Sequence, residues 1–182
     1  MTLRRVGAWT LALAFGVGVV AVLLVVLGSR DKSTFQDTSG PGQVFRDQGA
    51  RHLQAGTPHA GFAYNSDPPT SGPHAVSAVT RDDTRLDTDR LLTALELGNV
   101  VLVYSDSALR GDLRALQRDV AGPFDPVVAS AGQAIVLARG HPVASSRITA
   151  LAWRHRLLAG SPRDPALRDF VEFWLGRGAP RP

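Results

Sequence analysis

The hydrophobic positions form one long uninterrupted run near the N-terminus and several short periodic runs in the C-terminal half. The long run, Val6–Leu27, has 22 positions without a charge. About 20 apolar residues in a helix span a hydrocarbon core of about 30 Å, so this run predicts a membrane-spanning helix. A secretory signal peptide has a shorter apolar region, about 7–15 residues, and a small-residue cleavage site that this run matches poorly. We therefore expect an uncleaved single-pass anchor that contacts the membrane through residues 6–27.

The charges beside this run predict the side of the membrane on which the rest of the chain lies. Two arginines precede the run without any acidic residue, whereas Asp31 stands among the basic residues that follow it. Basic residues and a short N-terminal tail favour the cytoplasmic side. We expect residues 1–30 to form a cytoplasmic tip and transmembrane anchor at the cell membrane. Residues 31–50, rich in Gly, Ser, Asp and Gln, predict a flexible tether, and residues 51–182 an extracytoplasmic domain.

The strongest periodic runs lie beyond residue 90. Val100–Tyr104 is apolar at every position and predicts a strand buried on both faces. Apolar residues spaced by three and four positions predict a helix over 107–120. A second helix is predicted to begin with Asp164 as N-cap and Pro165 at its first position, and to end at Gly176.

Shorter runs predict the remaining elements of the domain. Residues 91–97 predict a helical turn, and 148–153 a strand. Two further strands, 126–130 and 133–139, are predicted to form a hairpin. Residues 51–90 are rich in Pro and Gly without either period, which predicts a long ordered loop. The fold class is therefore α+β: one compact domain with a small mixed or antiparallel sheet, two packed helices and this loop.

Composition and charge narrow the possible partners. The absence of cysteine excludes disulfides, a thiolate nucleophile and a lipidated cysteine. Four of the 20 basic residues flank the apolar run, so the chain from Ser33 onward carries 16 basic and 15 acidic residues. Nucleic-acid binding needs a concentrated basic face, so we expect no nucleic-acid partner. The mixed-charge run Arg81–Asp87 predicts a solvated turn, and His155, between two arginines, an exposed basic cluster.

The densest candidate for chemistry is the loop Tyr64–His74. Its three prolines fix φ, and Gly72 supplies the backbone freedom that a Cβ would forbid. A chain this stiff loses little entropy on ordering and can hold His74 in a defined place. His74 is then either a structural histidine bonded to a nearby carbonyl, or a presented ligand or acid–base group.

The same loop belongs to a wider set of motifs. Four motifs follow one another along the chain: Gly49–His52, then Pro68–His74, then Leu95-Glu96 with Gly98 and Tyr104, and finally Gly176–Pro180. Together they resemble a bacterial family of membrane-anchored proteins, domain-of-unknown-function family 3105. The resemblance covers essentially the whole domain, and its Pro-Pro-Thr-Ser-Gly-x-His loop is the most specific element.

The resemblance implies a cluster of histidines with one carboxylate, which suits a divalent transition metal. Where the family pattern has two histidines around Leu-Glu, this chain has Thr93 and Leu97. The metal ligands that remain as candidates are His52, His74 and Glu96. The site is therefore expected to be reduced relative to that of the family.

Three functions stay open. The first is a non-enzymatic membrane-tethered domain that binds a metal ion, a small ligand or an envelope protein, with binding residues Tyr64, Ser71, His74 and Tyr104. The second is a metal-assisted envelope enzyme in which Glu96 or His74 handles protons; the two missing histidines weigh against it, and no catalytic residue is assigned. The third is a structural protein whose loop only packs. Convergence of the three candidate ligands would favour the first two.

Overall fold

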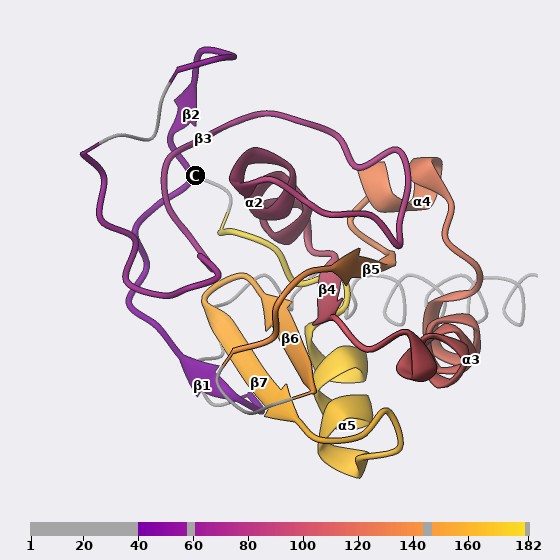
Figure 1. Cartoon of the computed structure of the whole chain (residues 1–182). Coiled ribbons are helices and arrows are strands. Elements are labelled where there is room, and N and C mark those ends of the chain that lie inside the picture. The colour runs from indigo at the N-terminus through magenta and orange to yellow at the C-terminus, as the bar shows by residue number, and fades with distance from the viewer. Residues whose placement is uncertain (1–39, 58–60, 144–146, 181–182) are drawn as a thin grey trace, which may run out of the picture. The chain divides into compact units, whose positions relative to one another are not determined.

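The computed structural model of this chain describes residues 40–57, 61–143 and 147–180, all within the unit Asp37–Pro182. These residues form an α+β fold, as the sequence predicts (Figure 1). The run predicted to cross the membrane, residues 6–27, lies outside the described residues. Among the residues that are described, no helix has the length and apolar character required to cross a membrane.

A mixed five-stranded sheet forms the centre of the fold. The strands, in spatial order, are β1 (Gln43–Val44), β7 (His155–Ala159), β6 (Ile148–Ala152), β4 (Val100–Tyr104) and β5 (Ile135–Arg139). β4 pairs parallel with β5 and antiparallel with β6, while β7 pairs antiparallel with both β6 and β1. Of the two predicted alternatives, the sheet is therefore the mixed one. β1 lies within the segment predicted as a tether.

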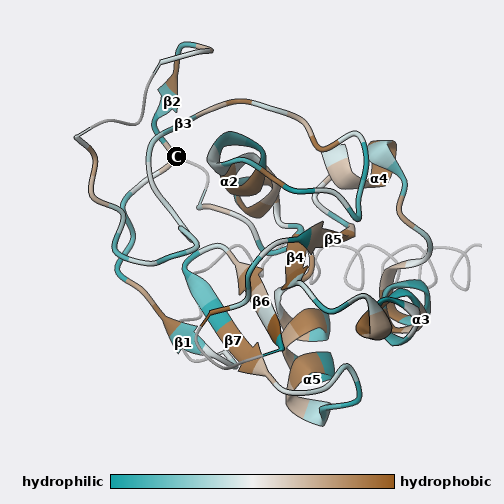
Figure 2. Cartoon of the chain, in the orientation of Figure 1, coloured by the Kyte–Doolittle hydropathy of each residue, from teal (hydrophilic) through white to brown (hydrophobic). Residues whose placement is uncertain are grey.

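The predicted strand Val100–Tyr104 is confirmed, and both of its faces are buried. Val100, Leu102 and Tyr104 pack on one side of the sheet with residues of α3 and α5. Val101 and Val103 pack on the other side with residues of α2. The alternation follows from the two-residue period of a strand. In Figure 2 the apolar colour is concentrated on the central strands, and the polar colour covers much of α3.

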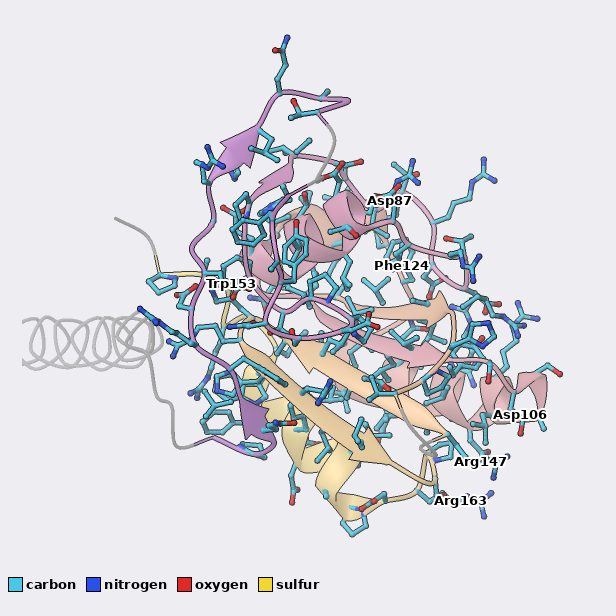
Figure 3. The ribbon with its side chains drawn as sticks, turned by 60° about the vertical axis from the view of Figure 1, so that its left-hand side comes forward. Asp87, Asp106, Phe124, Arg147, Trp153 and Arg163 are labelled. Atoms are coloured by element: carbon cyan, nitrogen blue, oxygen red, sulfur yellow. The ribbon has the colours of Figure 1, made fainter. Side chains whose placement is uncertain are left out.

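Four α-helices surround the sheet within the described residues: α2 (Thr88–Leu97), α3 (Arg110–Ala121), α4 (Pro126–Ser130) and α5 (Pro165–Trp174). A short 3-10 turn, η2 (Ser107–Leu109), precedes α3. The predicted N-cap of α5 is confirmed, since the Asp164 side chain accepts from the backbone N–H of Ala166. Asp87 caps α2 in the same way, at the position that Figure 3 labels. The described residues thus contain more helices than the two packed helices that the sequence predicts.

The predicted hairpin over residues 126–139 is wrong. Residues 126–130 form α4, because the Asp125 side chain accepts from the N–H of Val127 and Pro126 occupies the first helical position. An N-cap followed by proline starts a helix, and this signal outweighs the β-branched Val127 and Val128. Only the second half of the predicted hairpin is a strand, β5, and it pairs with β4 instead.

The sequence interpretation also missed β7 and misplaced His155. The chain reverses after β6 at Arg154, whose φ is +65°, and returns antiparallel as β7. His155 opens β7 and is buried, with its ring stacked on Trp174 at 3.7 Å between centroids. The expected exposed basic cluster is therefore wrong at this residue. Trp153 is buried, whereas the labelled Arg147 and Arg163 lie at the surface (Figure 3).

The mixed-charge run Arg81–Asp87 is not a fully solvated turn. The side chains of Asp82 and Asp83 are only 8% and 10% exposed, and both pair with Arg114 of α3. Asp83 also lies beside β5, because the neighbouring Thr84 forms an isolated parallel β-bridge with Ala138. Opposite charges on α3 therefore draw both carboxylates to the sheet.

Candidate metal centre

Two short strands bring the first two candidate ligands together. β2 (His52–Leu53) and β3 (His74–Ala75), both labelled in Figure 1, pair in parallel. In this register His52 lies directly opposite His74. Residues opposite each other in a ladder point to the same face. The two imidazole rings are accordingly close, with centroids 5.5 Å apart and planes at 74°.

Helix α2 supplies the carboxylate. The Asp89 carboxylate accepts from the N–H of Ala75 at 2.7 Å, and the Thr93 hydroxyl accepts from the N–H of Ser77 at 3.0 Å. Asp89, Thr93 and Glu96 are spaced by four and three positions, so they share one face of the helix. The two hydrogen bonds hold that face against β3, and this places Glu96 beside the histidines.

The three side chains converge on one point. Nε2 of His52 lies 3.0 and 2.9 Å from the two Glu96 carboxylate oxygens, and Nε2 of His74 lies 2.9 Å from Oε2. Their ligand atoms all lie within 4.8 Å of one another. The His74 side chain is fully buried, whereas the side chains of Glu96 and His52 are 23% and 52% exposed. The cluster therefore has a closed inner side and an open outer side.

His74 is oriented by its own loop. Its Nδ1 lies 2.9 Å from the carbonyl oxygen of Gly72, which can only accept, so Nδ1 carries the proton. Nε2 is buried and makes no hydrogen bond of acceptable geometry, although Oε2 of Glu96 is 2.9 Å away. An unprotonated Nε2 and a carboxylate both present lone pairs and repel. Either a proton on Nε2 or a cation shared with Glu96 resolves that repulsion.

The loop before His74 is fixed by polar and steric contacts. The Tyr64 hydroxyl donates to the carbonyl of Pro73 at 2.6 Å, and the Ser71 hydroxyl accepts from the N–H of Gln48 at 3.1 Å. Gly72 has φ +131°, and the Tyr64 ring occupies the space that a Cβ would need. Tyr64 and Ser71 thus hold the loop that orients His74. Their predicted role in binding stays a prediction.

The C-terminal segment holds the end of α2 from the other side. Gly98 ends the helix in the left-handed conformation, with φ +111°. The N–H of Gly176 donates to the carbonyl of Gly98 at 2.8 Å, and the N–H of Ala179 donates to the carbonyl of Glu96 at 2.9 Å. The Gly176–Pro180 motif therefore packs on the backbone that carries Glu96. The sequence alone indicates this motif but not its contact with the end of α2.

Of the remaining sequence candidates, Tyr104 lies apart from the three ligands, whereas Thr93 and Leu97 lie on α2 close to Glu96. Tyr104 points to the other side of the sheet, where its hydroxyl donates to Asp83. Burial, the hydrogen bond and the charge of Asp83 raise the pKa of Tyr104 to about 12. Thr93 is buried and its hydroxyl is used to hold β3, while Leu97 is 41% exposed. Neither can replace an imidazole.

The fold and this cluster define a small α+β domain with a His/His/carboxylate group where a two-stranded parallel ladder meets a helix. The family described as "Protein of unknown function (DUF3105)" matches residues 56–182, and the chain belongs to this family. His74 and Glu96 fall inside the match, whereas His52 precedes it. No curated protein and no solved structure matches the chain.

Proposed function

We propose that this chain is a membrane-tethered, extracytoplasmic domain that binds one divalent transition-metal ion through His52, His74 and Glu96. The observation that carries the proposal is the convergence of their three ligand atoms within 4.8 Å. Two imidazoles and one carboxylate are ligands that zinc, copper and iron accept in proteins. The residues come from β2, β3 and α2, so only the folded chain assembles the set.

The spacing of the atoms fits a shared ion. Metal–nitrogen and metal–oxygen bonds of about 2.1 Å, at angles between 90° and 109°, separate neighbouring ligand atoms by about 3.0–3.4 Å, close to the separation found here. The Nε2 of His74 and Oε2 of Glu96 are 2.9 Å apart. The hydrogen bond from Nδ1 of His74 to Gly72 is the outer-shell contact that fixes a ligating imidazole.

The open side of the cluster favours a site that exchanges its ion or accepts a further ligand. His52 and Glu96 are both partly exposed, and three protein ligands leave at least one coordination position to water or a partner molecule. A purely structural zinc site has four protein ligands and is closed. The proposed metal site is therefore an open one that remains in contact with solvent.

The tethered location rests on the sequence. The uncharged run Val6–Leu27 is long enough to span a bilayer, and the basic residues before it favour a cytoplasmic N-terminus. Residues after the anchor then lie outside the cytoplasm, where the domain meets metal ions of the environment rather than the cytoplasmic pool.

Calorimetric titration of the purified full-length chain, without an affinity tag, with Zn²⁺ and with Cu²⁺ tests the metal site. Wild type should bind one ion. His52→Ala and Glu96→Gln each remove a ligand and should weaken binding by at least about 100-fold, more than the loss of an outer-shell contact. Glu172→Gln, which removes an exposed carboxylate on α5, is the matched control and should bind as wild type does. If neither ion binds wild type, the metal proposal is wrong.

A single introduced cysteine tests the location independently. The chain has no cysteine of its own, so Ala131→Cys, at an exposed position after α4, gives one reactive thiol. A membrane-impermeant maleimide should label it in intact cells. Labelling that requires lysis would place the domain in the cytoplasm and contradict the proposed location, without bearing on the metal site.

A further inference from the structure

A cavity lies where the parallel strands β4 and β5 of the main sheet end. Its volume is about 240 Å³. It is lined by Arg85, Tyr104, Ser105, Arg139, Gly140 and His141. Tyr104 and Arg139 are the last residues of β4 and β5, which pair in parallel, so the cavity opens at the carboxyl ends of both strands. Ligands of sheets with parallel strands commonly bind at that edge.

The charges around this cavity do not balance. Asp83 pairs with Arg110 at 2.6 Å and with Arg139 at 3.0 Å, and Asp82 pairs with Arg114 at 2.7 Å. Among the described residues, these three arginines pair with no other carboxylate. Three guanidinium groups therefore share two carboxylates, which leaves one positive charge uncompensated.

Arg85 adds a second positive charge. It is exposed, lines the cavity, and forms no ion pair with any residue that the structure describes. Arg139 reaches Asp83 only through its Nε–H, so its two terminal nitrogens make no hydrogen bond to other described residues. The imidazole of His141 and the hydroxyl of Ser105 add further polar groups. The cavity thus presents several free donors around an excess of two positive charges.

The size of the cavity restricts its occupant. Pockets for drug-sized ligands measure about 300–1,000 Å³. This cavity is smaller, and a compact group matches both its volume and its charge. Guanidinium groups bind the oxygens of phosphate and carboxylate through paired hydrogen bonds. An excess of two charges matches a phosphate dianion better than a single carboxylate. We infer that this cavity binds the phosphate group of a small soluble molecule, at a site separate from the metal centre.

Calorimetric titration of the metal-free full-length chain with inorganic phosphate, at low ionic strength in a chloride buffer, tests this inference. We expect saturable binding that Arg85→Ala weakens about tenfold, as the loss of a charge-assisted hydrogen bond predicts. Glycerol phosphate should bind as well, which would identify phosphate esters as ligands, and acetate should bind more weakly than phosphate. Equal affinity for acetate would contradict the charge argument.

Arg81→Ala is the matched control. Arg81 is also exposed and four residues from Arg85, but it does not line this cavity. Its removal lowers the net charge by the same amount and should leave phosphate affinity within about twofold of wild type. If the two variants lost phosphate affinity equally, net charge alone would explain the effect and the inference would be wrong. It would also be wrong if wild type showed no saturable binding of phosphate. Because the titration uses the metal-free chain, its result is independent of the metal proposal.

Discussion

Gly98→Ala tests whether the C-terminal segment positions Glu96. Gly98 has φ +111°, and an added Cβ would lie 2.9 Å from the carbonyl carbon of Gly176 and 3.1 Å from the nitrogen of Gly178. The left-handed backbone alone costs a non-glycine residue about 1 kcal/mol. Displacing the packed segment adds about 1–2 kcal/mol, in the range of core overpacking. We expect a total loss of about 2–3 kcal/mol in the free energy of unfolding.

Thermal unfolding of the purified chain, followed by near-ultraviolet circular dichroism, measures this loss as a fall in Tm on the order of 10 °C. Gly56→Ala is the control for backbone strain, because Gly56 has φ +80° and nothing lies within 4 Å of its added Cβ. It should lose only about 1 kcal/mol. Zn²⁺ affinity should fall in Gly98→Ala and not in Gly56→Ala. Equal losses of stability in the two variants, or an unchanged affinity in Gly98→Ala, would refute the role of the segment.

Two further predictions concern buried side chains that can gain or lose a charge, His155 and Asp83. Burial lowers the pKa of His155 below its ordinary value of 6.5; the unfolded chain therefore takes up the proton first, and stability should fall as pH drops through 6.5. His155→Phe keeps a ring on Trp174 and should flatten the dependence of Tm on pH between 7 and 5; a slope equal to that of wild type would contradict this. Asp83→Asn removes the acceptor charge of a mostly buried group and should cost about 2–3 kcal/mol in denaturant unfolding. Asp119→Asn, at an exposed ion pair, should cost less than about 1 kcal/mol, and equal losses would show that burial of Asp83 is unimportant.

The elements that could be predicted are those whose signals are local. Val100–Tyr104 is apolar at every position, and this pattern is typical of a strand with both faces covered. The start of α5 was correct because Asp164 and Pro165 satisfy the first helical turn by themselves. The same pair of signals stands at Asp125 and Pro126, where the β-branched residues that follow favour a strand instead.

The elements that were missed depend on distant partners. β7 contains polar and apolar residues in an irregular order, and it is a strand because β6 and β1 pair with its two edges. Asp82 and Asp83 look like residues of a solvated turn until α3 brings Arg114 beside them. Neither partner can be identified from neighbouring residues in the sequence.

The candidate ligands were named from the sequence, but their convergence could not be. His52 and His74 are 22 positions apart, and only the parallel register of β2 and β3 sets them side by side. The position of Glu96 depends in turn on Asp89 and Thr93, whose contacts with β3 orient α2. Thr93 is informative here, because the residue that stands where the resemblance implies a histidine now serves to fix the helix.

Helix α5 connects the N-terminal end of the described residues with the cluster of His52, His74 and Glu96. Near its C-terminal end, the indole N–H of Trp174 donates to the carbonyl of Pro41 at 2.9 Å, just before β1. Two residues later the chain leaves the helix and binds the end of α2 through Gly176 and Ala179. The segment around Pro41, within the predicted tether, and the backbone of Glu96 are therefore held by the same short stretch. A change that loosens this stretch should disturb the geometry of the candidate ligands even though it touches none of their side chains.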